Sequence, residues 1–128
     1  MANKELTKAE EQVMQILWRL KQGFLKDIVE EFPQPRPAYT TVSTVIRVLV
    51  RKEIVGFKTY GKINQYYPLI SKTDTFKSKL KPIITNYFNG SKTDMASYFA
   101  HTHLNLSELE EVKSLIEEKI KKLKEAKK

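Results

Sequence analysis

The stretch TTVSTVIRVLV, residues 40–50, constrains the fold most strongly, because its composition and its hydrophobic period disagree. Eight of its eleven residues are β-branched, which is typical of strands. Strand alternation, however, would place Val45 and Leu49 on the same face as Arg47. On a period of about 3.6 residues, the apolar side chains instead share one arc, opposite the threonines and arginines. Because burial commonly overrides intrinsic propensity, we predict a helix over residues 39–52.

Two further helices are predicted before this segment. Thr7 and Glu10 have the spacing of a capping box, in which a hydroxyl and a carboxylate satisfy free amides of the first turn. An apolar repeat follows and predicts a helix that ends at Gly23, and a second repeat predicts a shorter helix behind it. The first repeat consists of Ala9, Val13, Ile16, Leu17 and Leu20, and the second of Leu25, Ile28, Val29 and Phe32.

The sequence PQPRP, residues 33–37, cannot continue a helix, because each proline fixes φ and disfavours the helical region in the residue before it. It could act as a polyproline ligand, but its place between two helical repeats favours a stiff connector. Residues 54–60 and 63–67 are predicted strands, joined at Gly61-Lys62, where glycine can supply the positive φ of a tight hairpin turn. Three helices and a basic-tipped hairpin predict a winged helix-turn-helix.

Positive charge is concentrated in the same part of the chain. Residues 34–72 carry seven basic side chains and one acidic one, whereas the remainder carries 16 basic and 14 acidic side chains. In a winged helix the third helix enters the major groove, where arginine can grip guanine or phosphate and threonine can bond a base edge. The alternative is a protein-interaction module whose basic face docks an acidic partner. The predicted DNA-binding residues are Arg36, Thr40, Thr41, Thr44, Arg47, Val48, Arg51, Lys58 and Lys62.

The C-terminal part predicts three more amphipathic helices. Pro82 should kink the first of them or delay its start, Ser91 resembles a cap of the second, and Ser107 with Glu110 has the spacing of a capping box for the third. Three amphipathic helices in about 50 residues cannot bury their apolar faces well alone, so we expect a homodimer, with packing onto the N-terminal domain as the alternative. The predicted dimerisation residues are Ile84, Tyr87, Phe88, Met95, Tyr98, Phe99, Leu109, Val112, Ile116 and Ile120.

These patterns predict a mainly α protein: residues 1–72 form a winged-helix DNA-binding domain with a small β-hairpin wing, and residues 73–128 form a three-helix dimerisation domain. Nothing indicates an enzyme, a metal or a cofactor. The chain has no cysteine, and the spacing of His101 and His103 puts their side chains on different sides of a helix. The polar first residues and the lack of an apolar run of about 18 residues lead us to expect a cytoplasmic protein.

Several segments resemble the BlaI/MecI penicillinase repressors, whose wider family includes the CopY copper repressors. They are LTKAEEQVMQILW (residues 6–18), TVSTVI (residues 41–46) with Leu49 and Lys52, and QYYPL (residues 65–69). The resemblance implies a dimeric bacterial repressor whose winged helix binds an inverted-repeat operator in double-stranded DNA. It also implies relief of repression by proteolysis in the dimerisation region, downstream of a membrane sensor protease, and the matching position is Tyr98-Phe99.

The chain departs from the family pattern at two positions that bear on the site. Relatives commonly carry a left-handed glycine where this chain has Glu53, which leaves the turn into the hairpin open. Many carry arginine at the position of Val48, whereas here Arg47 stands one residue earlier. One residue rotates a side chain by about 100° on a helix, so the operator sequence should not be copied from relatives. Without cysteines, the metal-sensing copper repressors are also a poor match.

Overall fold

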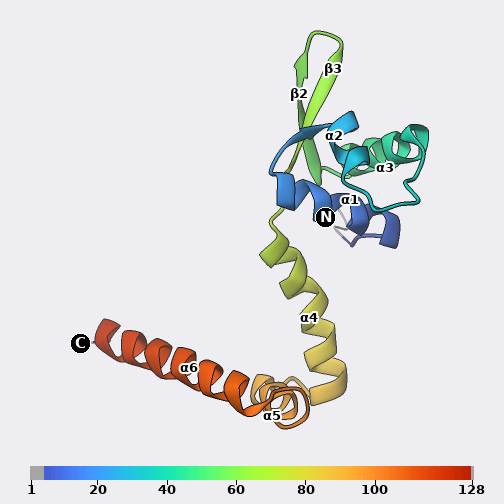
Figure 1. Cartoon of the computed structure of the whole chain (residues 1–128). Coiled ribbons are helices and arrows are strands. Elements are labelled where there is room, and N and C mark those ends of the chain that lie inside the picture. The colour runs from blue at the N-terminus through green and yellow to red at the C-terminus, as the bar shows by residue number, and fades with distance from the viewer. Residues whose placement is uncertain (1–4, 128) are drawn as a thin grey trace. The chain divides into compact units, whose positions relative to one another are not determined.

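A computed structural model of the chain describes residues 5–127 and divides into two compact units, one ending at Ser78 and the other beginning at Lys79. The first unit holds α1 (Lys8–Leu20), β1 (Gly23–Phe24), α2 (Leu25–Glu30), α3 (Tyr39–Arg51), β2 (Val55–Tyr60) and β3 (Ile63–Pro68) (Figure 1). The elements α4 (Lys72–Phe88), α5 (Lys92–Thr102) and α6 (Leu106–Ala126) follow, and the division falls inside α4. The fold is mainly helical with one small antiparallel sheet, as predicted.

Helix α1 starts as predicted. The Thr7 hydroxyl accepts a hydrogen bond from the Glu10 amide at 3.2 Å, and the Glu10 carboxylate accepts one from the Thr7 amide at 2.8 Å. The helix ends at Leu20, not at Gly23, because Lys21 already has a left-handed φ of 73°. Ala9 is exposed and Glu10 is buried, so the prediction that Ala9 lies on the apolar face was wrong.

The sheet contains a strand that was not predicted. β1 has only two residues and pairs antiparallel with β3, which gives the strand order β1-β3-β2. Two residues are too few to show the alternation of a strand, and the sequence pattern predicts the end of a helix at Gly23. Helix α2 ends at Glu30, so Phe32 lies beyond it, although Phe32 still packs against the core.

Helix α3 confirms the prediction for residues 40–50: their helical hydrophobic period decides the structure, not the strand propensity of their β-branched side chains. Val42, Ile46 and Leu49 are buried, and Val45 and Val50 pack partly against the same core. The other buried apolar residues come mainly from α1, α2 and the start of the hairpin: Leu6, Val13, Met14, Ile16, Leu17, Ile28, Val29, Ile54 and Val55. Burial of its apolar face in this core therefore holds α3 in a fixed orientation within the unit.

The turn between α3 and β2 keeps the left-handed geometry that glycine would supply. Glu53 adopts a φ of 63°, and the amide of Ile54 donates to the Leu49 carbonyl at 2.9 Å. This resolves the open question about the departure at Glu53: the turn forms, with a non-glycine residue in a conformation that costs about 1–3 kcal/mol.

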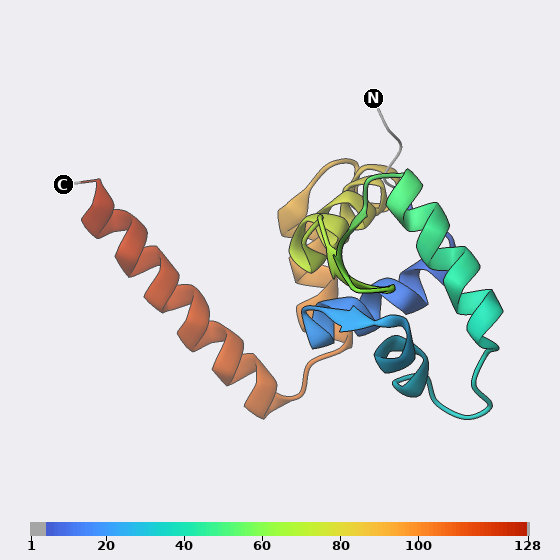
Figure 2. The same ribbon diagram turned by 90° about the horizontal axis from the view of Figure 1, so that it is seen from above.

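No residue of the second unit between positions 79 and 127 is fully buried. None of the residues of α4, α5 or α6 is buried, and α6 is one continuous helix (Figure 2). Pro82 lies inside α4 and does not delay its start, because the Ser71 hydroxyl caps the helix by accepting from the Asp74 amide at 3.0 Å. No helix among residues 5–127 has both the length and the apolar character needed to cross a membrane.

The N-terminal cap of α5 agrees with the prediction, whereas that of α6 differs from it. Ser91 caps α5 by accepting from the Asp94 amide at 3.0 Å, as predicted. The predicted capping box of Ser107 and Glu110 is wrong. Asn105 is the N-cap of α6, and its side chain accepts from the Glu108 amide at 2.9 Å while Glu108 accepts from the Asn105 amide at 3.0 Å. Asparagine is as good a cap as serine, so the earlier residue begins the helix.

Candidate nucleic-acid interface

The polar face of α3 is the centre of the candidate interface. Thr40, Thr41, Thr44, Arg47 and Arg51 are all exposed, on the side opposite the buried apolar stripe. A helix whose one side is fixed in a core and whose other side offers two guanidinium groups has the form needed for a major groove. The structure thus brings together the α3 residues that the sequence predicted.

Two of these α3 positions have further constraints. The Thr44 hydroxyl donates to the Thr40 carbonyl at 2.9 Å, so in this rotamer its proton is already used within the helix. Its oxygen remains able to accept a hydrogen bond from a base amino group. Val48 is half-buried at the edge of the face, where a methyl group can meet a thymine methyl.

The wing supplies the second part of the interface. Lys58 in β2 and Lys62 in the turn are exposed, and Gly61 takes the predicted positive φ, at 62°. Residues 54–70 contain no Asp or Glu, so no carboxylate within the hairpin offsets these two charges. The hairpin therefore offers positive charge and no negative charge of its own to a polyanion.

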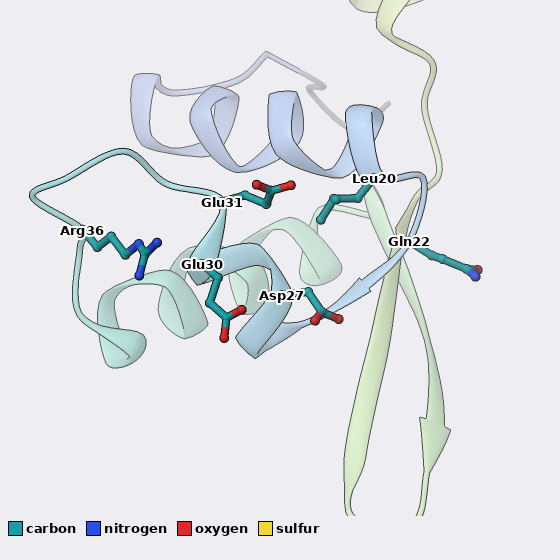
Figure 3. Close-up of a pocket in the computed structure, with 6 residues that line it drawn as sticks. All are labelled: Leu20, Gln22, Asp27, Glu30, Glu31 and Arg36. Atoms are coloured by element: carbon teal, nitrogen blue, oxygen red, sulfur yellow. The ribbon is translucent and has the colours of Figure 1, made fainter.

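Arg36 does not lie on the face of α3. It stands in the proline-rich connector, where its Nε donates to the Phe32 carbonyl at 3.2 Å. Figure 3 shows Arg36 beside a hollow with three carboxylates around it, those of Asp27, Glu30 and Glu31. These carboxylates would repel a DNA phosphate that approached Arg36. A contact between Arg36 and DNA therefore stays a prediction that its charged neighbours do not favour.

A partly buried ion pair links α1 to the end of α3. The Glu10 carboxylate contacts the Lys52 ammonium through both oxygens, at 2.9 and 3.0 Å. Burial raises the pKa of Glu10, but the hydrogen bond from the Thr7 amide and the hydrogen bond and charge of Lys52 outweigh it, so the pKa of Glu10 is lowered. Lys52 is one of the seven basic residues of the segment 34–72, but its ammonium binds Glu10 of α1.

The sequence contained a signal for this pair. Glu10 precedes Val13, Met14 and Leu17 by three, four and seven residues, which places its side chain on the buried stripe of α1. A carboxylate on such a stripe requires a cationic or hydrogen-bonding partner. Sequence reasoning treated Glu10 only as a capping residue and missed this second role.

The predicted dimerisation residues of the second unit are all at least partly exposed. Ile84, Phe88 and Met95 are half-buried, and the other seven have more than a third of their surface exposed. Tyr98 and Phe99 lie within α5, and their rings are 5.7 and 5.5 Å from that of His103. Within residues 5–127, no group of three or more His, Cys, Asp or Glu side chains could hold a metal ion.

Comparison of the sequence with known proteins identifies the family of this chain. The family model described as "Penicillinase repressor" matches residues 6–118. The methicillin resistance regulatory protein MecI of Mammaliicoccus sciuri is 30% identical over 117 residues, which cover 90% of this chain and 95% of the relative. A penicillinase repressor of Staphylococcus aureus is 33% identical over 128 residues, covering 95% of this chain and 100% of the relative.

A solved structure supports the fold assignment. The solution structure of the DNA-binding domain of the repressor BlaI matches with a TM-score of 0.51 at 21% identity, over 58% of this chain and 93% of that domain. At this identity the likeness concerns the fold, and the fold is the winged helix predicted from the hydrophobic pattern. Family model, relatives and fold agree: the chain belongs to the penicillinase repressor family.

Proposed function

We propose that this protein is a sequence-specific DNA-binding repressor that places α3 in the major groove of an operator and its wing on the flanking DNA. The observation that carries the proposal is the exposed polar face of α3, with Arg47 and Arg51 opposite a buried stripe, beside a carboxylate-free hairpin. Relatives named as a methicillin resistance regulator and a penicillinase repressor support a role in antibiotic resistance.

The second part of the proposal is a homodimer on an inverted repeat. Helices α4, α5 and α6 bury none of their residues, yet they carry many apolar side chains with at least half their surface exposed, including Tyr87, Tyr98, Phe99 and Ile116. A second copy can cover these side chains by a twofold axis, and a twofold dimer matches an operator with two opposed half-sites. Packing of α6 onto the first unit is the alternative.

The third part concerns regulation. The resemblance to the penicillinase repressors favours proteolysis near Tyr98-Phe99 by a pathway that begins at a membrane sensor protease. Loss of the segment that follows this position would remove α6 from the dimer, together with its apolar stripe of Leu109, Val112, Ile116 and Ile120. Binding to an operator with two half-sites would then weaken. Incubation with the sensor protease, followed by mass determination of the fragments, tests the position of the cut.

The proposed DNA binding is tested with duplexes selected by the full chain from a random-sequence pool. We expect one enriched sequence with twofold symmetry, and a complex that persists in excess competitor DNA over a series of salt concentrations. The rival function, docking of an acidic protein partner through the basic face, predicts no enriched sequence and only salt-labile binding. That result would overturn the repressor assignment.

A further inference from the structure

We propose that the apolar pair at the tip of the wing, Tyr60 and Ile63, packs into the minor groove that flanks the operator half-site and supplies a contact that does not depend on salt. The inference rests on the proposed repressor function and goes beyond it, because it assigns DNA contact to two uncharged residues outside the predicted interface.

The position of the pair follows from the register of the hairpin. Tyr60 and Ile63 are directly opposed across β2 and β3 and flank the turn of Gly61 and Lys62. Directly opposed residues point to the same face of a sheet, so the two side chains form one apolar tip. Tyr60 is 50% exposed and Ile63 is 56% exposed, which leaves much of this apolar surface in water.

Tyr60 is held in place by another ring. The centroid of Phe24 in β1 lies 6.0 Å from that of Tyr60, in an edge-to-face arrangement with an interplanar angle of 71°. Phe24 pairs with Gln65 across the sheet, and Gln65 pairs with Lys58, so all these side chains share the face of Tyr60 and Ile63. A braced aromatic ring loses little conformational freedom when it binds a partner.

The charge around the pair favours DNA as the partner. Lys58 lies on the same face and Lys62 lies in the turn between the pair, while residues 54–70 carry no acidic side chain. Phosphates on both strands border the minor groove, and apolar side chains can enter it and pack between or along the sugars and bases. Lysines that reach the phosphates would bring Tyr60 and Ile63 to the groove between them.

The test compares variants on the duplex that the wild-type chain selects from a random pool. We expect the double variant Tyr60→Ser, Ile63→Ser to bind about tenfold more weakly, with the same slope of log Kd against log salt as the wild type. Lys62→Ala should weaken binding and lower that slope by about one, because it removes one counterion-releasing contact. Shortening the flanks of the duplex should weaken the wild type about tenfold more than the double variant, which has only its lysine contacts to the flanking phosphates left to lose.

Controls separate a groove contact from a folding defect. Phe57→Ser removes an apolar side chain of similar exposure, 46%, from the opposite face of the hairpin, and its affinity should stay within twofold of the wild type. Ile63→Ser alone preserves the Phe24–Tyr60 ring contact and should still lose about threefold in affinity; circular dichroism and melting temperature check the fold of each variant. Unchanged affinity of the correctly folded Ile63→Ser variant would overturn this inference and leave the proposed repressor function standing. Failure of the wild type to select any sequence would overturn the repressor function, and the inference with it.

Discussion

At the scale of single residues, Glu10 has three structural roles. It caps α1, it lies on the buried stripe of that helix, and it holds Lys52 at the end of α3. Its side chain is 5% exposed, so the Lys52 ammonium and the Thr7 amide take the place of water around the carboxylate. One side chain therefore links the start of α1 to the end of α3, the helix that is proposed to bind DNA.

The pKa of Glu10 predicts a loss of stability in acid. Because that pKa is lowered from 4.5, the stabilisation from Glu10 is fully present above about pH 4.5 and is lost as the pH falls through the lowered value. We expect Glu10→Gln to lower the free energy of unfolding by about 1–3 kcal/mol at pH 7, and this difference to shrink as the pH falls below 4.5 and through the lowered pKa of Glu10. Urea unfolding at fixed protein concentration measures both.

The exposed Glu30 is a matched control for Glu10. Its carboxylate is 4.0 Å from Lys26 on the surface of α2, so Glu30→Gln should change stability by no more than about 0.5 kcal/mol at any pH. Equal effects of Glu10→Gln and Glu30→Gln would contradict a special role for the Glu10–Lys52 pair.

Arg47 and Arg51 are expected to contribute base or phosphate contacts from the exposed face of α3. Replacement of either by alanine should weaken binding to the selected duplex by about 1–3 kcal/mol, measured by fluorescence anisotropy. Lys26→Ala removes an exposed positive charge from α2 and should leave the affinity nearly unchanged. If Lys26→Ala and the arginine variants lose the same affinity, net charge and not the face of α3 governs binding.

At the scale of elements, the turn between α3 and β2 forms with Glu53 in a left-handed conformation. Glycine adopts this conformation without strain, although it also loses more backbone entropy on folding. We therefore expect Glu53→Gly to raise the free energy of unfolding by about 0.5–1 kcal/mol, and Glu53→Val to lower it by about 1 kcal/mol. Glu53→Ala, which keeps the strain and removes the carboxylate, isolates the contribution of the side chain in the same thermal melts.

The hairpin contains a close approach between Gly56 and the ring of Tyr67. A Cβ atom at Gly56 would lie 2.8 Å from the Tyr67 Cζ, so Gly56→Ala must displace the ring. We expect a loss of about 1–2 kcal/mol in stability, and a much smaller loss when the same substitution is made in Tyr67→Ala. Equal losses in both backgrounds would show that the ring is not the obstacle.

At the scale of the whole molecule, the proposed dimer explains why α4, α5 and α6 lack buried residues. Ile116→Lys places a charge in the middle of the α6 stripe and should shift the protein to monomers by analytical ultracentrifugation, with weaker operator binding. Leu115→Lys is the matched control, because Leu115 is similarly exposed but lies off the stripe. A wild-type chain that is monomeric at micromolar concentration would contradict the dimer.

What the sequence by itself determined is the set of locally encoded elements. The period of residues 40–50 predicted α3 against its β-branched composition, the prolines of residues 33–37 marked the connector, and the glycine turn marked the wing. These features depend on steric limits and on burial patterns within a few residues. The division of α3 into a buried stripe and an exposed polar face followed from the same pattern, and the structure confirms it.

Only the tertiary structure decided features that join distant parts of the chain. β1 becomes a strand because β3 pairs with it, and Lys52 leaves the basic face because Glu10, 42 residues away, holds its ammonium. Helix ends at Lys21 and Asn105 were likewise decided by which of several competent residues satisfied the free backbone groups. A local pattern offers such groups several partners, and the choice among them depends on which partners the folded chain brings within bonding distance.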